Sequence, residues 1–558
     1  MQSPSDTIPG ALRHWATTRA AEPFCTFIAR GEAERITFGE LLERSLAYAR
    51  RYRELGVRPG ETVIVMLPHS PHLFYAFLGA TLVGAVPAFM AFPSVKQRPE
   101  IYWADHAKLF GRIRPRLIVT YEANAADAAR TLGESALEVL IAGDPLLDDA
   151  GDTRSGALPA VFDPAAVAVL QHSSGTTGSK KGVMLTHRAI FAHTRALNAA
   201  LDLQPRDATV SWLPLYHDMG FIACFMGSVL NGTHLILLDP FEWVVRPGLL
   251  FDAIQRYRPQ FCWLPNFAFS HLARVAPANR RWDLSSIRAF IDCSEPCKPA
   301  TLERFAERFA ADSVTPAQLH VCYAMAENVF GVTQTPLERP ARILDVDREA
   351  FLGGAVLPAS GDETALRLLS CGVPLPGVEL AIRAPGGGPA GAGRVGEIAI
   401  RSPFLFAGYD RLPERTAAVL RDGWYSSGDL GFIDAGELFV TGRVDDMIIV
   451  NGRNYYAHEI EALVNDEPGV AAGRAVAVGI EVAQSDATAI VVLLEGEAGA
   501  DEAVLKRRVK ERIFDALALA LHAVAVVPRG TLLKTTSGKL DRERNKLVYT
   551  NTRPEESA

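Results

Sequence analysis

Residues 169–187, VLQHSSGTTGSKKGVMLTH, decide how the rest of the chain is interpreted. The apolar run 166–170 before the loop predicts a short buried strand, and a second apolar run resumes at Val183. Between the runs lie small hydroxyl residues, glycines and the neighbouring lysines Lys180 and Lys181. Glycine lets successive backbone N–H groups turn inward, where they form a nest that binds anions. The stretch therefore predicts a loop that binds a polyphosphate.

This loop differs from two common phosphate-binding motifs. A Walker A loop needs Gly-x4-Gly-Lys-Ser/Thr, and neither Gly175 nor Gly178 starts such a pattern. The stretch contains no Gly-x-Gly-x-x-Gly either. On spacing alone, an ordinary Ser/Gly surface loop between two strands stays open as the alternative.

The sequence SSGTTGSKKGVMLTH resembles the phosphate loop of the acyl-adenylate-forming enzymes. That family includes acyl-CoA synthetases, luciferases, nonribosomal adenylation domains and fatty acyl-AMP ligases. Lys180 stands where the family usually has proline, and Lys181 keeps the family lysine. The resemblance implies that the loop binds ATP and that Thr176 is also a ligand of Mg²⁺. The loop residues assigned to ATP are Ser173, Ser174, Gly175, Thr176, Thr177, Gly178 and Lys181.

Length and composition indicate a globular protein of two or more domains. The chain has 558 residues, 48% of them hydrophobic, and a net charge of −7 that argues against a general nucleic-acid binder. Its seven cysteines form no Cys-x-x-Cys pair, which indicates reduced core residues of a cytoplasmic protein. No signal peptide opens the sequence. Residues 73–92 have the length of a membrane span, but Gly79, Gly84 and Pro87 favour a helix, a break and a strand.

Strands and helices alternate up to about residue 440, which predicts a large α/β domain with sheets rich in parallel strands. Beyond Gly442 the predicted elements are shorter, as in a small α+β domain. We therefore predict a large domain over residues 1–442 and a small mobile domain over residues 443–558. The predicted strands are 62–67, 117–120, 209–213, 234–238 and 289–292, and the predicted helices are 71–83, 188–201, 247–257, 299–311 and 502–517.

A second motif, WLPLYHDMG at residues 212–220, resembles the family signature whose histidine lies near the carboxylate and gates the acyl pocket. His217 matches that histidine, and the sequence after it is most similar to the fatty acyl-AMP ligase version. A histidine at a helix N-terminus, with Asp218 as the cap, is the alternative. Position alone predicts an acyl pocket, with ordinary core as the alternative, from Trp212, Phe221, Phe225, Met226 and Phe267.

Two further motifs resemble the adenine side of the nucleotide site. Ser294 and Glu295 follow a predicted strand, as in the family's adenine-side loop, although Glu295 could equally be a solvated acid. CYAMAE at residues 322–327 resembles the family motif Tyr-Gly-x-Thr/Ala-Glu. Tyr323 can stack on adenine, and Glu327 supplies a hard oxygen for Mg²⁺. The resemblance implies that the nucleotide also adjoins Ala324, which replaces the family glycine, and Met325 and Ala326.

The remaining motifs surround the predicted domain boundary. Asp429 matches the family carboxylate that accepts both ribose hydroxyls. Arg443 matches a residue that contacts the nucleotide, and Asp445 matches the hinge pivot. LKTTSGK at residues 533–539 resembles the C-terminal lysine loop, in which Lys539 bridges the carboxylate oxygen and the α-phosphate. A lysine in a Ser/Gly loop, considered without the other motifs, indicates a solvated side chain. Because six family motifs occur in the family's order, a catalytic role is favoured, and the resemblance implies that Lys539, His217 and Arg443 are catalytic.

Together these motifs predict an enzyme that uses ATP and Mg²⁺ to convert a fatty acid into acyl-AMP and pyrophosphate. Residues 343–359 resemble the insertion of fatty acyl-AMP ligases, which favours transfer to a holo-acyl carrier protein over free CoA. A fatty acyl-CoA synthetase and an inactive scaffold that binds acyl-AMP stay open as alternatives. One predicted helix is strongly basic. Its cations could form an ordinary solvated face or a docking surface for an acidic carrier protein. They are Lys506, Arg507, Arg508, Lys510 and Arg512.

Overall fold

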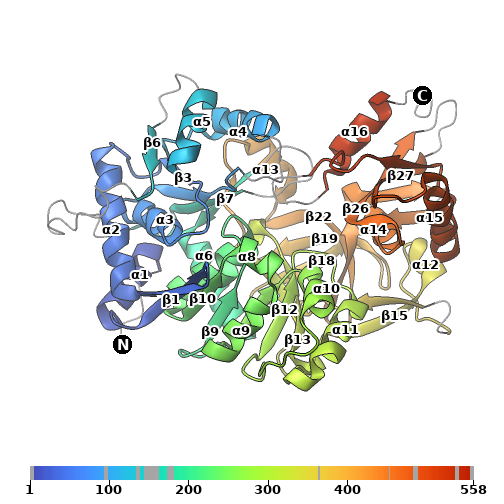
Figure 1. Ribbon diagram of the computed structural model, residues 1–558, viewed down its shortest axis with the longest axis horizontal. Helices are drawn as coiled ribbons and strands as arrows, with labels where there is room; N and C mark the ends of the chain where they lie inside the picture. Colours follow the sequence, from blue (N-terminus) through green and yellow to red (C-terminus); the bar gives the residue numbers. More distant parts are fainter. Residues whose placement is uncertain are drawn as a thin grey trace.

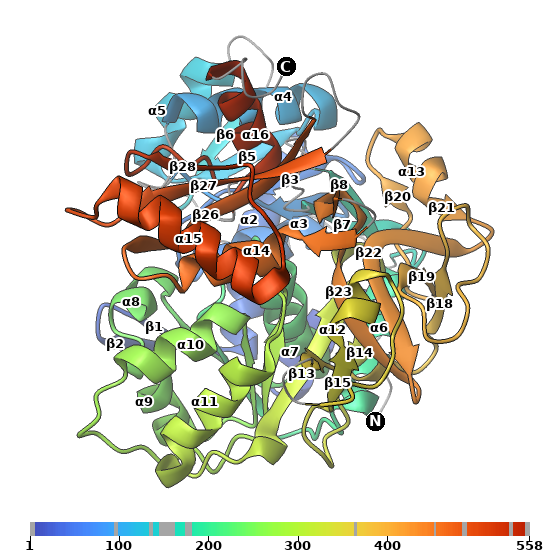
Figure 2. The same ribbon diagram turned by 90° about the vertical axis from the view of Figure 1, so that its right-hand side faces the viewer.

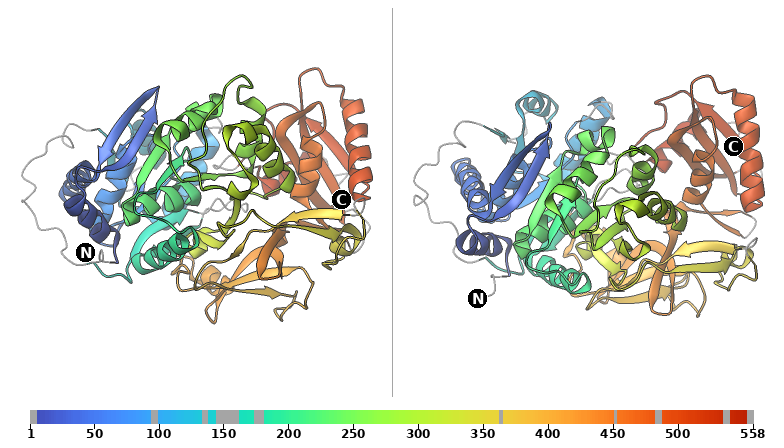
Figure 3. Two further views of the ribbon diagram at one scale, coloured as in Figure 1. Left: turned by 90° about the horizontal axis from the view of Figure 1, so that it is seen from below. Right: turned by 60° about the horizontal axis from the view of Figure 1, so that its bottom comes forward.

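The computed structural model describes residues 6–93, 99–132, 138–143, 162–172, 181–361, 365–450, 453–481, 488–534 and 540–552. Helix α1 (Ile8–Thr18) lies at one end of the molecule, and a smaller C-terminal domain lies at the other (Figures 1 and 3). Between them a large α/β domain holds the sheets on which the predicted motifs lie.

The largest sheet has nine strands in the order β17-β14-β13-β12-β11-β9-β10-β1-β2. Neighbouring strands from β13 to β1 run parallel, and antiparallel strands flank them at both edges. Its central strands β9, β11 and β12 are short and buried along their whole length, as parallel strands covered on both faces must be. The strands are β1 (Pro23–Ala29), β2 (Glu32–Thr37), β9 (Ala208–Ser211), β10 (His234–Leu238), β11 (Phe261–Leu264), β12 (Ala289–Cys293), β13 (Leu319–Ala324), β14 (Gly331–Gln334) and β17 (Val373–Pro374).

Helices connect these strands and cover the sheet, as the predicted alternation requires (Figure 1). They are α6 (His187–Ala200), α7 (Gly227–Asn231), α8 (Pro240–Val245), α9 (Gly248–Tyr257), α10 (Asn266–Val275) and α11 (Pro299–Phe309). A π-helix, Met219–Met226, follows the His217 motif. The predicted strands and helices of this region are confirmed to within a few residues at their ends.

A second sheet contains four parallel strands in the order β4-β3-β5-β6. Here α3 (His72–Leu82) is buried, and a Cβ at Gly79 would lie 2.6 Å from the Cβ of Tyr48, so glycine lets α2 and α3 approach closely. Helix α3 and strand β4 confirm the helix, break and strand predicted for residues 73–92. No helix among the described residues is long and apolar enough to span a membrane. The other elements are α2 (Phe38–Glu54), α4 (Pro99–Ile113), α5 (Glu122–Leu132), β3 (Thr62–Val65), β4 (Val86–Phe89), β5 (Leu117–Thr120) and β6 (Glu138–Ile141).

The last part of the large domain departs from the predicted alternation. Its strands form antiparallel sheets: β20 pairs with β8 and, through it, β7, which come from earlier in the chain, and β18-β19-β22-β21 form a second sheet with β23 paired to β22. The prediction of alternation up to about residue 440 is therefore wrong here, because glycine turns join β18 to β19 and β22 to β23 directly. The elements are β7 (Val167–His172), β8 (Gly182–Thr186), β18 (Glu379–Arg383), β19 (Gly396–Arg401), β20 (Gly408–Tyr409), α13 (Pro413–Val419), β21 (Leu420–Arg421), β22 (Trp424–Asp434) and β23 (Glu437–Arg443).

The smaller domain consists of a hairpin, a three-stranded sheet and helices. Figure 2 shows α14 and α15 on one side of this sheet and α16 near α4 of the large domain. The elements are β24 (Met447–Val450), β25 (Arg453–Tyr456), α14 (Ala457–Asn465), β26 (Val470–Glu481), β27 (Thr488–Gly496), α15 (Glu502–Leu517), β28 (Ala523–Val527) and α16 (Arg542–Thr552). The predicted helix 502–517 is confirmed.

Helix α15 buries its apolar stripe but pairs most of its cations. Leu505, Val509 and Ile513 are buried, as the helical spacing predicts. Four of these cations form ion pairs with acidic residues of the same domain. Lys506 lies 2.6 Å from Glu502, and Arg507 lies 3.8 Å from Glu511. Arg508 and Arg512 both pair with Glu467. These contacts favour an ion-paired solvated face over a docking surface with free positive charge.

The predicted insertion folds against both domains. It forms β15 (Ile343–Asp347) and α12 (Arg348–Leu352), and β15 pairs with β16 (Ala365–Leu369). Phe351 is buried against Leu430 and Phe439 of the large domain. Leu352, only 4% exposed, belongs to the hydrophobic core of the smaller domain. The insertion is therefore a packed bridge, as its apolar residues predict.

Candidate active site

The predicted nucleotide residues lie at the carboxyl ends of β12 and β13 and on the neighbouring strands β22 and β23. Parallel strands of an α/β sheet bind ligands at this edge. Two residues there have left-handed backbone angles, Ser294 with φ 72° and Val329 with φ 64°. Such angles are costly for residues other than glycine, and they cluster at functional sites. Both residues follow a strand that the sequence motifs mark.

Tyr323, Asp429 and Arg443 form one hydrogen-bonded group. The Tyr323 hydroxyl donates to Asp429 Oδ2 at 2.6 Å, and Arg443 Nε donates to Asp429 Oδ1 at 2.8 Å. Asp429 and Arg443 are partners across the β22–β23 ladder, which brings two distant motifs together. Burial raises the pKa of Asp429, while Arg443 and Tyr323 oppose that rise. Each carboxylate oxygen keeps a lone pair with which to accept a further hydroxyl.

Glu327, Tyr409 and Lys181 form a second group beside the first. Glu327 lies in the turn after β13 and is 8% exposed. The Tyr409 hydroxyl donates to Glu327 Oε1 at 2.7 Å, and Lys181 Nζ lies 4.8 Å from the centre of the Tyr409 ring. Burial lowers the pKa of Lys181, with Arg415 adding to the fall and Glu327 opposing it. A partly desolvated cation and a buried carboxylate thus flank one tyrosine.

Two predicted catalytic segments lie outside the described residues. These are the phosphate loop, with Ser173, Ser174, Gly175, Thr176, Thr177 and Gly178, and the loop of Lys539. The strands around the phosphate loop are described: β7 and β8 are antiparallel, with His172 opposite Gly182. Lys181, the first described residue after this segment, lies with its Nζ over the Tyr409 ring, whose hydroxyl binds Glu327.

The adenine-side loop is fixed to the start of α10. Asn266 Nδ2 donates to Asp292 Oδ2 at 2.5 Å, and the Phe267 amide donates to Glu295 Oε2 at 3.0 Å. Burial raises the pKa of Asp292 well above its ordinary value. The Glu295 carboxylate therefore has a structural partner, although this contact is exposed and both interpretations of Glu295 stay open. Beyond β13, Met325 is half-buried and its amide donates to the Phe330 carbonyl at 2.9 Å, while Ala324 is half-buried and Ala326 is buried.

A family model for the AMP-binding enzymes matches residues 12–410 of the chain. The chain belongs to the AMP-binding enzyme family. A long-chain-fatty-acid–AMP ligase of Mycobacterium marinum is 30% identical over 96% of each chain. A medium-chain-fatty-acid–[acyl-carrier-protein] ligase of Moorena producens is 30% identical over 69% of this chain and 68% of its own. A structure from studies of fatty acyl-adenylate ligases from E. coli and L. pneumophila aligns with a TM-score of 0.89, at 27% identity over 98% of both chains.

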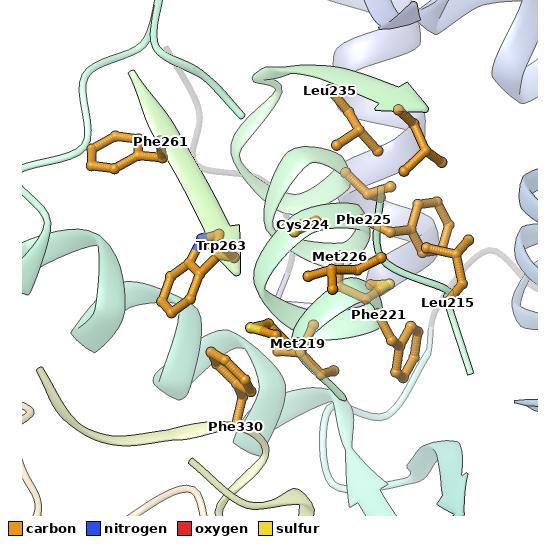
Figure 4. Close-up of a cluster of buried hydrophobic side chains, with 14 of the residues drawn as sticks. Leu215, Met219, Phe221, Cys224, Phe225, Met226, Leu235, Phe261, Trp263 and Phe330 are labelled. Atoms are coloured by element: carbon orange, nitrogen blue, oxygen red, sulfur yellow. The ribbon is translucent and has the colours of Figure 1, made fainter. Parts of the chain in front are cut away.

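The five residues predicted for the acyl pocket of this AMP-binding enzyme lie in two clusters. Trp212 stacks on Trp243 at 3.7 Å between ring centres, and Phe267, 46% exposed, lies 6.0 Å from Trp212. Phe221 and Phe225 leave the π-helix on the side away from Trp263, as Figure 4 shows, and the buried Met226 lies on the same helix. Their rings pack against Phe77 and other core rings. The pocket assignment stays a prediction.

A cavity lies on the other side of the π-helix of this AMP-binding enzyme, next to α6 and β11. Its lining includes Ile222 and Ala223 of the π-helix, Trp263 of β11 and His193 of α6. His193 is fully buried, and burial lowers its pKa to about 3. Trp263 and Phe330 lie near Met219 (Figure 4). The ring of Phe330, three residues after Glu327, lies 5.3 Å from that of Trp263 in the cavity lining.

Half-buried His217 lies just before the π-helix, where its amide donates to the Pro214 carbonyl at 3.3 Å and its ring lies 4.8 Å from that of Tyr216. Asp218 accepts a hydrogen bond from the Met219 amide at 2.9 Å. The capping alternative is therefore present in the structure beside the predicted catalytic position.

Sequence reasoning missed Tyr409 and Arg542 as site residues. Tyr409 stands in no motif that we identified, and only its pairing opposite Val183 across β20 and β8 brings it to Glu327. Arg542 pairs with Asp446 at 2.7 Å and with Glu461 at 2.7 Å, which connects the segment after the Lys539 loop to the predicted hinge. Arg542 follows Lys539 closely in sequence, but nothing in the pattern identifies its partners.

Proposed function

We propose that this enzyme activates a fatty acid with ATP to form acyl-AMP and pyrophosphate, and then transfers the acyl group to the phosphopantetheine thiol of an acyl carrier protein. The observation that carries this proposal is the convergence of the Tyr323–Asp429–Arg443 group and the Glu327–Tyr409–Lys181 group at one sheet edge. Apart from Tyr409, these residues come from four separate sequence motifs. The similarity to fatty acid–AMP and fatty acid–carrier ligases supports the substrate and the acceptor.

The first half-reaction needs positioning and charge neutralisation. A carboxylate is ionised at neutral pH, so no base has to activate it. Its oxygen forms a bond to the α-phosphorus of ATP, and the bond from that phosphorus to pyrophosphate breaks. Tyr323 stacks on adenine, and Asp429 accepts the ribose hydroxyls. Lys181 and Lys539 place positive charge where phosphate charge develops, which is a large term in such reactions.

The residues present fit a Mg²⁺ ion held mainly by substrate. No cluster of three or more His, Cys, Asp or Glu side chains suited to a metal occurs in the part of the chain that the structure describes. Glu327 offers one buried carboxylate whose Oε1 is held by Tyr409. Mg²⁺ typically takes one or two carboxylates together with phosphate oxygens and water. Glu327 and Thr176 would hold the ion, which supplies charge neutralisation at the phosphates.

The second half-reaction requires the smaller domain to move. We propose a boundary at residues 442–443 and rotation about Asp445, which lies in a single 3-10 turn between β23 and β24. The insertion supports a carrier protein as acceptor, because Leu352 and Arg348 attach it to the smaller domain. His217, Arg443 and Lys539 are the proposed catalytic residues, and the acyl group occupies the apolar region next to the π-helix.

Mass spectrometry of products tests this function. The full chain is incubated with ATP, Mg²⁺ and a panel of fatty acids, with CoA and a holo-carrier protein offered side by side. Acyl-AMP with CoA alone and a thioester with the carrier support the proposal. Rapid acyl-CoA formation would identify an acyl-CoA synthetase, and bound acyl-AMP without pyrophosphate release would identify an inactive scaffold.

A further inference from the structure

We propose that the cavity between α6, the π-helix and β11 holds the fatty acyl chain, and that the hydrogen-bonded pair Asn198–Asn231 ends it, which selects fatty acids of medium chain length. The inference rests on the proposed function and names the substrate class and two specificity-determining residues. The empty space of the cavity is about 430 Å³, and ligand cavities typically hold about 300–1,000 Å³. Trp263 of its lining and the core rings of Phe221 and Phe225 lie on opposite sides of the π-helix (Figure 4).

One end of the cavity contacts the turn that carries Glu327. The Phe330 ring lies 5.3 Å from the Trp263 ring and 6.2 Å from the His193 ring, and Trp263 and His193 both line the cavity. The Phe330 carbonyl accepts a hydrogen bond from the Met325 amide at 2.9 Å, which closes the turn around Glu327. We therefore place the carboxylate of the fatty acid at this end of the cavity.

The other end of the cavity lies at the amino edge of the nine-stranded sheet. Phe261, the first residue of β11, is the register partner of Thr209 in β9, and both line the cavity. Thr233, which directly precedes β10, lines it as well. One face of α6 runs between the two ends, and at about 1.5 Å per residue it spans about 12 Å from His193 to Leu201. The lining residues on this face are His193, Thr194, Leu197, Asn198 and Leu201.

Two asparagines connect α6 to α7 at the far end. Asn198 Nδ2 donates to Asn231 Oδ1 at 2.7 Å, and Asn231 Nδ2 donates to Asn198 Oδ1 at 3.1 Å. Both residues line the cavity, and Asn231 precedes Thr233 of the amino edge by two positions. Because each amide satisfies a donor and an acceptor of the other, the pair does not depend on a polar group of the ligand. It therefore suits a boundary for an alkyl chain better than a site that recognises a polar chain end.

Helix α1 fixes the position of this boundary. Asn231 is the last residue of α7, and Gly232 after it has a φ of 66°. Trp15 Nε1 donates to the Leu230 carbonyl at 3.2 Å, and a Cβ at Gly232 would lie 2.6 Å from the Trp15 ring. The end of α7 is thus packed tightly against α1. An alkyl chain that extends past the pair has to break its two hydrogen bonds and leave amide groups against CH₂ groups, which is costly.

The distance between the two ends predicts the chain length. Three bonds of a fully extended chain span about 3.6 Å, so an alkyl chain advances about 1.2 Å per bond. About ten carbons therefore fill the 12 Å along α6. Each carbon buried in the cavity should raise kcat/KM about fourfold, and the first carbon beyond the asparagine pair should lower it. The enzyme should therefore have its optimum at a medium chain length.

The test measures kcat/KM for pyrophosphate release by the full chain with ATP and straight-chain saturated acids from hexanoic to octadecanoic acid. The double variant Asn198→Ala, Asn231→Ala should move the optimum to acids about two carbons longer and raise kcat/KM for those acids about tenfold, because the boundary is removed. Ala223→Leu adds bulk to the π-helix side of the lining and should move the optimum to shorter acids. Ratios between acids within one variant do not depend on the fraction of the protein that folds.

Asn124→Ala is the matched control. Asn124 is a buried asparagine of α5 whose Nδ2 donates to Thr120 Oγ1 at 3.0 Å, and it is not part of the cavity lining. This variant should keep the wild-type order of preference among the acids. A wild-type enzyme that shows no decline toward the longest acids, or an optimum that is the same in wild type, Ala223→Leu and the double variant, overturns this proposal alone. A wild-type enzyme that releases no pyrophosphate with any fatty acid refutes the proposed function together with it.

Discussion

Replacing Tyr409 with phenylalanine removes one hydroxyl group from the centre of the candidate site. The lost hydroxyl donates to Glu327 Oε1 at 2.7 Å, and the two side chains are 2% and 8% exposed. Phenylalanine keeps the ring over which Lys181 lies at 4.8 Å and the ring contact with Phe406 at 4.9 Å. The change therefore removes the hydrogen bond that orients the proposed metal-binding carboxylate, together with the hydrogen bond between the Tyr409 and Tyr425 hydroxyls.

The magnitude follows from the charge and burial of the acceptor. A hydrogen bond to a charged group contributes about 1.5–3 kcal/mol. One factor of ten corresponds to about 1.36 kcal/mol, so full loss in the transition state lowers the rate about 10- to 100-fold. We expect this fall in pyrophosphate release with fatty acid and ATP, largest at limiting Mg²⁺. Thioester formation from supplied acyl-AMP should change little.

Tyr52→Phe is the matched control for this prediction. The Tyr52 hydroxyl donates to the Ala76 carbonyl at 2.9 Å in a fully buried position remote from the site. Both variants lose a buried hydroxyl and should unfold at slightly lower temperature, but only Tyr409→Phe should change the Mg²⁺ dependence. A Tyr409→Phe enzyme with wild-type rate and Mg²⁺ dependence would refute the role of the hydrogen bond.

Three further changes test other parts of the structure. Lys539→Ala should lower pyrophosphate release about 100- to 1000-fold and thioester formation from supplied acyl-AMP far less; equal losses contradict its role. Leu352→Ala should loosen the insertion and raise the yield of acyl-CoA, measured by mass spectrometry against wild type; an unchanged yield argues against restraint by the insertion. Burial lowers the pKa of His193 in the folded protein to about 3, from 6.5. As the pH falls below 6.5, the unfolded chain therefore binds a proton before the folded protein does. The stability that is present above pH 6.5 is lost as the pH falls. His193→Phe should therefore reduce the loss of unfolding free energy between pH 7 and pH 5 by about 2 kcal/mol in denaturant titrations, and an equal loss in both proteins rejects this assignment.

Short buried strands explain why much of the fold could be predicted. Strands such as β5 and β10 are continuous apolar runs bounded by polar residues, and they match the predicted bounds. The predicted alternation of strands and helices was wrong for residues 365–443. The antiparallel strands there have both buried and exposed residues, so their hydrophobic pattern is weaker than that of parallel strands covered on both faces. The π-helix after His217 also has no simple periodicity in sequence.

The candidate site divides in the same way. Asp429 and Tyr323 could be named from motifs, but their direct hydrogen bond depends on how β22 lies beside β13. Tyr409 could not be found, because its role comes from strand pairing and not from its neighbours in sequence. Phe221 and Phe225 were predicted from proximity along the chain, whereas alternate faces of the same helix line the cavity and the core.

The proposed choice of acceptor depends on the contacts that the proposed rotation would break. Leu352 is 4% exposed in the core of the smaller domain although it belongs to the insertion, and burying a leucine contributes about 1.5–3 kcal/mol. Arg348 Nη1 donates to the Ala516 carbonyl at 3.1 Å, a charged hydrogen bond that adds about 1 kcal/mol at this half-buried position. Both contacts attach the insertion to the smaller domain, for which we propose a rotation.

Two ion pairs add to this restraint, Arg453–Glu349 at 2.9 Å and Arg544–Asp105 at 2.9 Å, each contributing about 0.2–1 kcal/mol at its exposure. The total is on the order of 4 kcal/mol, which keeps the rotated arrangement near one molecule in about a thousand before it gains contacts of its own. Free CoA has only its contacts with the active site to offset that cost. A carrier protein adds an interface between two folded surfaces, so the same rotation becomes accessible to a thiol that arrives on a docked partner.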